Sequence, residues 1–247
     1  MTEEVVTTCF HHKDRETGRS CTRCGRPACP DCLVQAAVGS HCFECVRAAR
    51  PPTRERMRRW NATAGPLVTK TLIGINFVVF ALTLGGSGRG FGGDVAAHLD
   101  LFGPAVADGE YWRLVTSGFM HFGIIHIAFN MVLLYRLGDM LEPALGRIRF
   151  AILYFAGLLG GSAGALLLSY NASTAGASGA VFGLMAAFVF ANRQGNLNVR
   201  DPGIGGLLAI NLVLTFAVSG VSIGGHLGGL AGGVIAAAVL WSPPFRP

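Results

Sequence analysis

Six long apolar segments constrain this chain more than any other feature of its sequence. They cover residues 67–86, 114–135, 150–170, 176–192, 203–219 and 223–241. Hydrophobic residues make up 51% of the chain and charged residues only 14%, whereas average soluble domains carry about 25% charged residues. So few charges cannot cover a globular surface, and most of the segments approach the length that spans a bilayer. The sequence therefore predicts an all-α polytopic membrane protein with a bundle of six transmembrane helices.

Positive charge predicts how these segments are oriented. The formal net charge is +6, and arginines gather in residues 47–66, 136–149 and 193–202 and again at Arg246. With six spans, all four stretches fall on one side of the membrane. The positive-inside rule then places both termini in the cytoplasm of a multi-pass plasma membrane (cell inner membrane) protein. A basic stretch can also bind nucleic acid, but beside an apolar span it favours topology, so we expect no nucleic-acid partner.

All seven cysteines lie in the first fifth of the chain, and with one histidine they form four pairs. Each pair has two intervening residues, a spacing that lets both side chains reach one Zn²⁺ ion. Eight ligands are enough for two tetrahedral structural zinc sites. Free thiols or disulfides are the alternative, but an odd cysteine count disfavours a pure disulfide scaffold. The pairs are Cys9 with His12, Cys21 with Cys24, Cys29 with Cys32, and Cys42 with Cys45; His11 and His41 are spare candidates.

This cysteine pattern resembles a B-box-like zinc finger. The resemblance implies interleaved pairs, with the first and third on one ion and the second and fourth on the other. We therefore expect a zinc-binding module at 1–46, a basic linker at 47–66 with a helical part over residues 53–60, and a membrane domain at 67–247. The module could bind a cytoplasmic protein partner, recognise a substrate tail or only fold; the sequence leaves these open.

Five polar residues interrupt the apolar segments at about the same depth. Ser178 and His226 lie near the outer starts of the fourth and sixth segments, and His121, His126 and Asn130 lie in the outer half of the second. Polar groups are rare in hydrocarbon, so a layer of them indicates a site. The fourth segment is short, which would place Ser178 below the membrane surface, where water must enter for hydrolysis.

These residue types fit a serine nucleophile activated by a histidine base. His226 would take the proton of Ser178 as a dyad without a carboxylate, and catalysis would need no cofactor. His126 and Asn130 share a helix face and can stabilise an oxyanion together with the Ser178 N–H, whereas His121 is expected to make a structural hydrogen bond. Alternatively, Ser178 is a packing serine, or the three histidines hold a metal ion. Glycines spaced by four in the fourth and sixth segments would bring those two helices into close contact.

The combination of motifs resembles the rhomboid family of intramembrane serine proteases. The resemblance rests on four motifs: Gly176-Ala177-Ser178-Gly179, the spacing of His121, His126 and Asn130, the run His226-Leu-Gly-Gly, and Tyr111-Trp112-Arg113. The resemblance implies that the chain cleaves transmembrane segments of membrane proteins near their outer end. It also implies Ser178 and His226 as the catalytic residues, His126 and Asn130 as oxyanion donors, and Phe182 as a ring packed on His226. Gly176, Gly179 and His121 would have structural roles near the site.

Two other classes of function compete with this prediction. A catalytically inactive rhomboid-like protein could bind membrane proteins as an adaptor, but the presence of both Ser178 and His226 disfavours it. A transporter or channel would need intramembrane charges along a path, and the predicted second to sixth segments contain none. The expected partners are therefore the lipid bilayer and membrane-spanning protein substrates.

Overall fold

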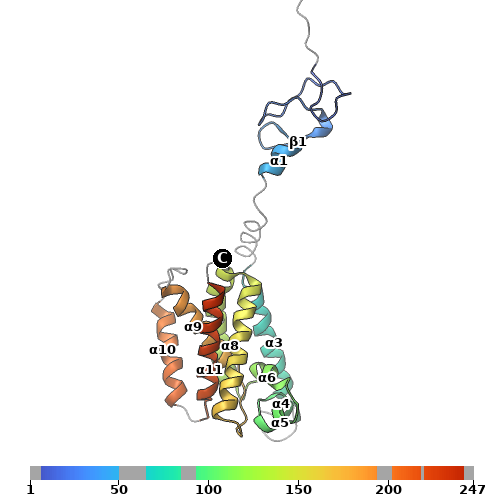
Figure 1. Ribbon diagram of the computed structural model, residues 1–247. Coiled ribbons are helices and arrows are strands. Elements are labelled where there is room, and N and C mark those ends of the chain that lie inside the picture. The colour runs from blue at the N-terminus through green and yellow to red at the C-terminus, as the bar shows by residue number, and fades with distance from the viewer. Residues whose placement is uncertain (1–6, 50–64, 85–92, 194–201, 218–219, 242–247) are drawn as a thin grey trace, which may run out of the picture. The chain divides into compact units, whose positions relative to one another are not determined.

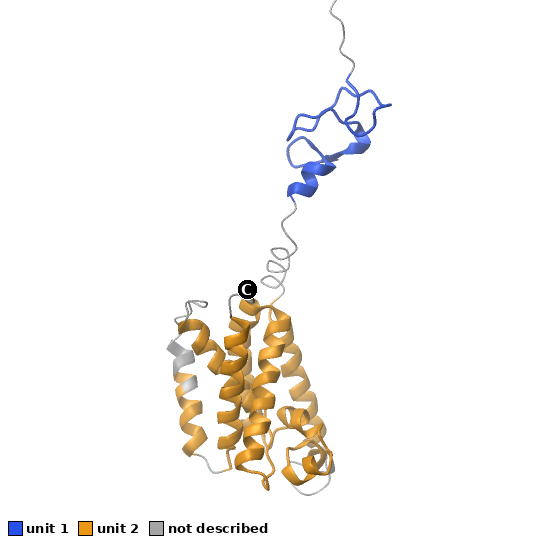
Figure 2. Cartoon of the chain, in the orientation of Figure 1, with its two compact units in different colours: residues 1–57 blue, residues 58–247 orange. Residues whose placement is uncertain are grey.

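The protein is described by a computed structural model over residues 7–49, 65–84, 93–193, 202–217 and 220–241. The chain divides into two compact units, Met1–Met57 and Arg58–Pro247 (Figure 2). Each unit is described by itself below. Most of the predicted linker, including Trp60, lies outside the described residues.

The first unit is small and is built around its cysteines. A short 3₁₀ helix η1 (Pro30–Cys32) leads into the antiparallel pair β1 (Leu33–Gln35) and β2 (Ser40–Cys42), which is followed by α1 (Phe43–Ala49). Its buried cluster consists of Cys9, Ala28, Cys29 and Cys32. A unit of this size buries too little apolar surface to be stable without disulfides or metal ions.

The second unit is a bundle of helices. Its long helices lie alongside one another (Figure 1) and are α3 (Leu67–Leu84), α7 (Ile124–Leu145), α8 (Arg147–Leu168), α9 (Ser178–Arg193), α10 (Pro202–Ala217) and α11 (Ile223–Leu240). Within the described residues, α3, α7, α8 and α11 are long and apolar enough to cross a membrane, and α9 is a shorter apolar helix. The predicted class, a helical multi-pass membrane protein, is confirmed; the count of six spans stays a prediction.

The second predicted span was wrong in its position. The sequence predicted a helix over 114–135 followed by a charged loop, whereas α7 begins at Ile124 and continues to Leu145. Residues before it form the short helices α6 (Arg113–Thr116) and η2 (Ser117–Phe119). Leucines 137, 141 and 145 are buried and recur every four residues, so an apolar stripe carries the helix through its charged second half.

The buried carboxylate of Glu142 explains how α7 tolerates charge there. Its side chain is 2% exposed, and its oxygens accept hydrogen bonds from the backbone N–H groups of Val68 and Thr69 and from the Thr69 hydroxyl. These N–H groups belong to the first turn of α3, which has no intrahelical acceptors for them. A negative charge is also favourable at that end of a helix dipole, so Glu142 joins α7 to the start of α3.

The connection between α3 and α7 is folded against the bundle. It contains α4 (Gly93–Leu99) and α5 (Gly103–Ala107) in addition to α6 and η2. Arg113, 5% exposed, binds the Asp100 carboxylate at 2.6 Å and the Glu110 carboxylate at 2.6 Å. Leu101 and Thr174 exchange two backbone hydrogen bonds. The connection is thereby fixed to the segment that leads into α9.

Helices α8, α9 and α11 approach one another most closely at glycines, where no side chain separates their backbones. A Cβ atom added to Gly229 or Gly233 of α11 would lie 2.2 Å from the carbonyl oxygens of Gly179 or Gly183 in α9. The same atom on Gly183 would lie 2.7 Å from Cα of Gly157 in α8. Real Cβ atoms do not approach backbone so closely, so these helices are in main-chain contact.

The glycines of α11 serve two neighbours, where the sequence predicted one. Gly229 and Gly233 face α9, but Gly224 and Gly228 face α8, where a Cβ would lie 2.3 and 2.2 Å from the carbonyl oxygens of Gly164 and Gly160. The sequence analysis assigned the glycines spaced by four in the sixth segment, Gly228 among them, to the contact with α9. It overlooked the same spacing in α8, where Gly157-x3-Gly161 and Gly160-x3-Gly164 stand.

Replacing Gly233 with alanine should destabilise the bundle. The added methyl group would meet the backbone of Gly183 at 2.2 Å, so α9 and α11 must separate, at a cost of about 3 kcal/mol in the free energy of unfolding. Gly74→Ala in α3 is the matched control, since a Cβ there meets nothing within 4 Å and alanine favours helix. Thermal unfolding in detergent should give a lower midpoint for Gly233→Ala and an unchanged or higher one for Gly74→Ala; equal midpoints would contradict the main-chain contact.

Candidate active site and metal centres

Ser178 is the first residue of α9, and Gly176 shapes the turn before it. Gly176 has φ of +127°, a backbone conformation that residues with a Cβ rarely adopt. A Cβ there would also lie 2.7 Å from the ring of His126. Gly176 therefore allows both the turn into α9 and the close approach of His126 to the segment that carries Ser178.

His121 holds the residue before Ser178. Its ring is 1% exposed, and its Nε2 accepts a hydrogen bond from the Ala177 N–H at 3.4 Å. Gly176 N–H donates to the Ser117 carbonyl oxygen at 2.8 Å. The sequence assigned His121 a structural hydrogen bond near the mouth of the site; the structure gives it a bond to the backbone and places the ring in the interior.

His226 lies in the first turn of α11 with its ring held from two directions. The Phe182 ring stacks on it with centroids 4.1 Å apart and planes 18° apart. Its Nδ1 lies 2.7 Å from the hydroxyl of Thr215 in α10. The sequence analysis named Phe182 but missed Thr215. Thr215 and Asn211 are buried polar residues one helical turn apart, and that spacing within an apolar segment was the available signal.

His126 and Asn130 lie one turn apart near the start of α7. The Asn130 Nδ2 donates to the backbone carbonyl oxygen of His126 at 2.9 Å. A side-chain amide has two N–H donors, so this bond occupies one and orients the other. The rings of His126 and His121 are in edge contact at 5.0 Å between centroids.

One cavity brings four of the predicted site residues together. It has a volume of about 1010 Å³ and is lined by Ser178, His226, His126 and Asn130, together with Asn211 and Thr215. Its remaining walls are largely apolar, with Phe122, Ile125, Phe129, Leu214 and Val221 among them. His121 is not among the residues lining it. The described residues that line this cavity include no aspartate or glutamate.

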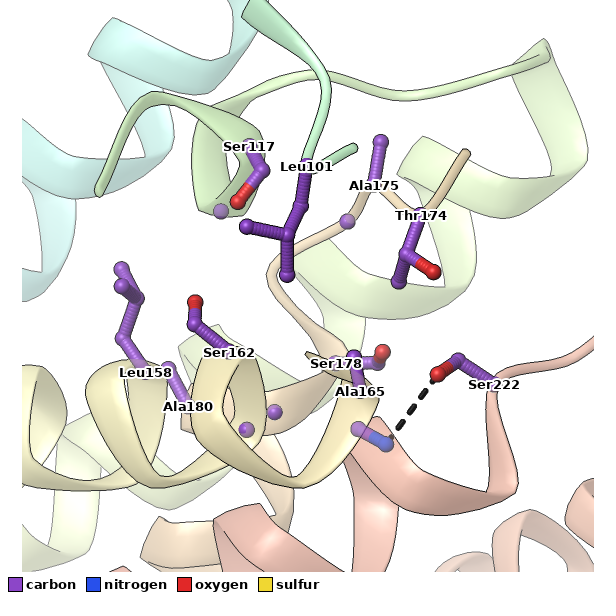
Figure 3. A pocket seen from close by; sticks show the side chains of 15 residues that line it. Leu101, Ser117, Leu158, Ser162, Ala165, Thr174, Ala175, Ser178, Ala180 and Ser222 are labelled. Carbon is purple, nitrogen blue, oxygen red and sulfur yellow. Dashed lines mark hydrogen bonds between the residues drawn. The ribbon is translucent and has the colours of Figure 1, made fainter. Parts of the chain in front are cut away.

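Ser178 also lines a second, much smaller cavity (Figure 3). Its volume is about 30 Å³, which is enough for one water molecule. The hydroxyl groups of Ser117, Ser162 and Ser222 belong to its wall, and Ser222 also caps α11 by accepting the Gly225 N–H at 3.1 Å. These hydroxyl groups and this size suit a single hydrogen-bonded water beside the serine.

In the first unit the eight predicted ligands form two clusters. Cys9, His12, Cys29 and Cys32 make one, and Cys21, Cys24, Cys42 and Cys45 make the other; within each, the ligand atoms lie within 4.8 Å of one another. This is the interleaved grouping that the B-box resemblance implied. His11 and His41 belong to neither cluster.

The spacing of the ligand atoms fits a zinc ion. Tetrahedral Zn–S bonds of about 2.3 Å place two sulfurs about 3.8 Å apart, and the Sγ atoms of Cys24 and Cys42 are 3.8 Å apart. The Nδ1 of His12 lies 3.3 Å from Sγ of Cys32 and 3.5 Å from Sγ of Cys29. The Cys42 N–H donates to Sγ of Cys21 at 3.2 Å, a bond that supports a metal ligand from outside its coordination shell.

Thiols crowded in this way titrate at very different pKa values. Burial raises the pKa of Cys32 to about 12, and the neighbouring thiols of Cys29 and Cys9 add to it. Burial also acts to raise the pKa of Cys9, but backbone N–H groups, first that of Cys29, outweigh it and lower the pKa to about 5. A divalent cation would let all the thiols of a cluster ionise, because it neutralises their mutual repulsion.

Comparison with known proteins relates the second unit to one family. Residues 108–243 match the Rhomboid domain family. The chain is 41% identical over 141 residues to the rhomboid protease GluP of Bacillus subtilis (strain 168), and 33% identical over 134 residues to YdcA of the same strain. It is also 34% identical over 151 residues to a Caenorhabditis elegans protein described as inactive rhomboid-related protein 2.

These matches cover about half of the chain and differing shares of the relatives. The match to GluP spans 56% of this chain and 28% of GluP, and the match to YdcA spans 53% of this chain and 67% of YdcA. The match to the inactive relative spans 56% of this chain and 43% of that relative. The family match contains α7 to α11, and with them every side chain that lines the large cavity. The cysteine clusters and α3 lie outside the matched residues.

Proposed function

This chain belongs to the rhomboid family, and from that premise we propose that it is an intramembrane serine endopeptidase with Ser178 as nucleophile and His226 as base. The observation that supports this most is that both side chains line one cavity, with the Phe182 ring stacked on His226. A stacked and buried imidazole has one orientation, as a general base requires.

The proposed reaction has two halves. In the first, His226 takes the hydroxyl proton while Ser178 Oγ attacks the peptide carbonyl carbon; the C–N bond then breaks, and His226 gives the proton to the leaving amine. In the second, His226 takes a proton from water, whose oxygen attacks the ester, and returns it to Ser178 Oγ as the C–O bond breaks. The small cavity beside Ser178 would supply that water.

The negative charge that forms on the carbonyl oxygen needs donors in place beforehand. We assign this role to His126, to the free N–H of Asn130 and to the Ser178 N–H. Ser178 begins α9, so its N–H lies in the first turn, where backbone donors have no intrahelical acceptor and the helix dipole is positive. His126 and Asn130 line the same cavity as Ser178.

The proposed substrates are transmembrane segments of other proteins. Phe122, Ile125, Phe129 and Leu214 give the cavity an apolar wall that suits such a segment. We propose that the chain cleaves such a segment near the outer end of that segment, in the plasma membrane. Both termini would be cytoplasmic, because the basic segments share one side under the positive-inside rule.

The domain division is also part of the proposal. It consists of a zinc module at 1–46, a linker at 47–66 and a protease domain at 67–247, with two structural zinc ions and a cytoplasmic protein partner for the module.

An inactive membrane-protein adaptor is the second candidate function. The relative described as inactive shows that similarity of this degree does not guarantee catalysis. The two candidates differ in whether Ser178 is an activated nucleophile.

Labelling with a serine-reactive fluorophosphonate separates the two functions. We expect the purified full chain to be labelled at Ser178, and the Ser178→Ala and His226→Ala variants to stay unlabelled, because attack on phosphorus needs both the hydroxyl and the base. Peptide mapping of the adduct identifies the residue. A folded wild-type protein without label would favour the adaptor, and label that persists in Ser178→Ala would refute this nucleophile.

A further inference from the structure

Thr215 gives His226 a partner that the motifs of the sequence do not supply. Its hydroxyl lies 2.7 Å from His226 Nδ1, and both side chains are buried, with 2% and 6% exposed. Thr215 belongs to α10 and His226 to α11, so the contact joins two helices.

The proton in this contact can be assigned from the second bond of the hydroxyl. Thr215 Oγ1 donates to the backbone carbonyl oxygen of Asn211 at 2.8 Å. A hydroxyl carries a single proton, so toward His226 it can only accept. The Nδ1 must therefore carry the hydrogen, and in a neutral imidazole this leaves the lone pair on Nε2.

We propose that Thr215 is a positioning residue that fixes the catalytic tautomer of His226. This inference rests on the proposed function, because it assigns Nε2 as the atom that takes the Ser178 proton. The described residues lining the cavity contain no carboxylate, so this hydroxyl fills the place that an acid has in a triad. It also accepts a stronger hydrogen bond from the ring once His226 becomes positively charged.

Two substitutions separate the hydroxyl from the shape of the side chain. Thr215→Val keeps the shape and removes the acceptor, whereas Thr215→Ser keeps the acceptor. For Thr215→Val we expect kcat on a transmembrane substrate to fall about 10- to 100-fold, the range for a hydrogen bond to a charged group, with little change in KM. Thr215→Ser should retain most of kcat. Thermal unfolding of both variants shows whether they fold.

A spectroscopic readout makes the test independent of activity. Nitrogen NMR of the full chain labelled with ¹⁵N-histidine reports which ring nitrogen is protonated, and the His226→Gln spectrum identifies the His226 signals. We expect the Nδ1–H form in the wild type and in Thr215→Ser, and a shift toward Nε2–H in Thr215→Val.

The outcomes distinguish this inference from the proposed function. A wild-type His226 with its proton on Nε2 would overturn the inference whatever the activity, and this reading does not require Thr215→Val to fold. Unchanged kcat and an unchanged tautomer in a folded Thr215→Val would also overturn it. If the wild type shows the Nδ1–H form but neither cleaves nor takes the fluorophosphonate, the proposed function fails while the tautomer assignment stands.

Discussion

Ser178→Ala and His226→Ala should each lower kcat/KM for a transmembrane substrate by on the order of 10⁴-fold or more, to the background rate. Nucleophile and base act as one unit, so removing either removes nearly the whole effect. The double variant should therefore be no slower than either single variant. Purified protein in liposomes with a fluorogenic transmembrane substrate provides the measurement.

A serine elsewhere in the same bundle serves as the control. Ser169 caps the end of α8 and lines neither cavity, so Ser169→Ala should cleave at the wild-type rate. Cleavage by a Ser178→Ala protein shown to be free of contaminating protease would refute the proposed Ser178–His226 mechanism. If the double variant loses the sum of the two single variants' losses in transition-state free energy, Ser178 and His226 act separately.

Zinc analysis of the full chain should give about two ions per molecule, one for each cluster. His12→Ala should reduce the content to about one, since it removes one ligand of the Cys9 cluster. His11→Ala is the matched control, because His11 is the neighbouring residue and belongs to neither cluster. Elemental analysis after gel filtration provides the numbers; no zinc in the wild type, or equal losses in the two variants, would contradict the assignment.

Removing the zinc should unfold the first unit. Apparent zinc-binding free energies in small zinc domains are about 10–16 kcal/mol, which exceeds what a core of Ala28 and a few cysteines can contribute. Far-ultraviolet circular dichroism and proteolysis after chelation would detect the change. Cleavage of a minimal substrate should continue, because the proposed catalytic residues all belong to the second unit. Chelator-sensitive cleavage would show that the two units are functionally coupled.

Sequence patterns sufficed where one local property decides the outcome. Uniformly apolar runs predicted α3, α8 and α11 to within a few residues of their ends. Paired cysteines predicted the eight ligands, and the B-box resemblance implied how they divide between the two clusters. Polar residues in apolar segments predicted four of the side chains that line the large cavity. The sequence analysis missed Asn211 and Thr215, which also line it, and named His121, which does not.

Features that depend on tertiary contacts were not predictable in this way. The charged half of α7 was predicted to be a loop, because the sequence does not show that the start of α3 donates hydrogen bonds to Glu142. Thr215 was overlooked because a threonine in an apolar helix usually bonds its own backbone, as it also does here. Only the fold shows that the same oxygen faces His226.

The glycine contacts among α8, α9 and α11 have a consequence for how the proposed reaction would start. Ser178 and His226 stand on two helices whose separation is set by main-chain atoms, with Gly229 against the Gly179 carbonyl group. Main chain in a helix has no rotamers to sample, so little conformational entropy remains to be lost when a substrate arrives. The proposed reactive pair would then be preorganised: the free energy needed to align it would be met during folding, before any peptide bond enters the cavity.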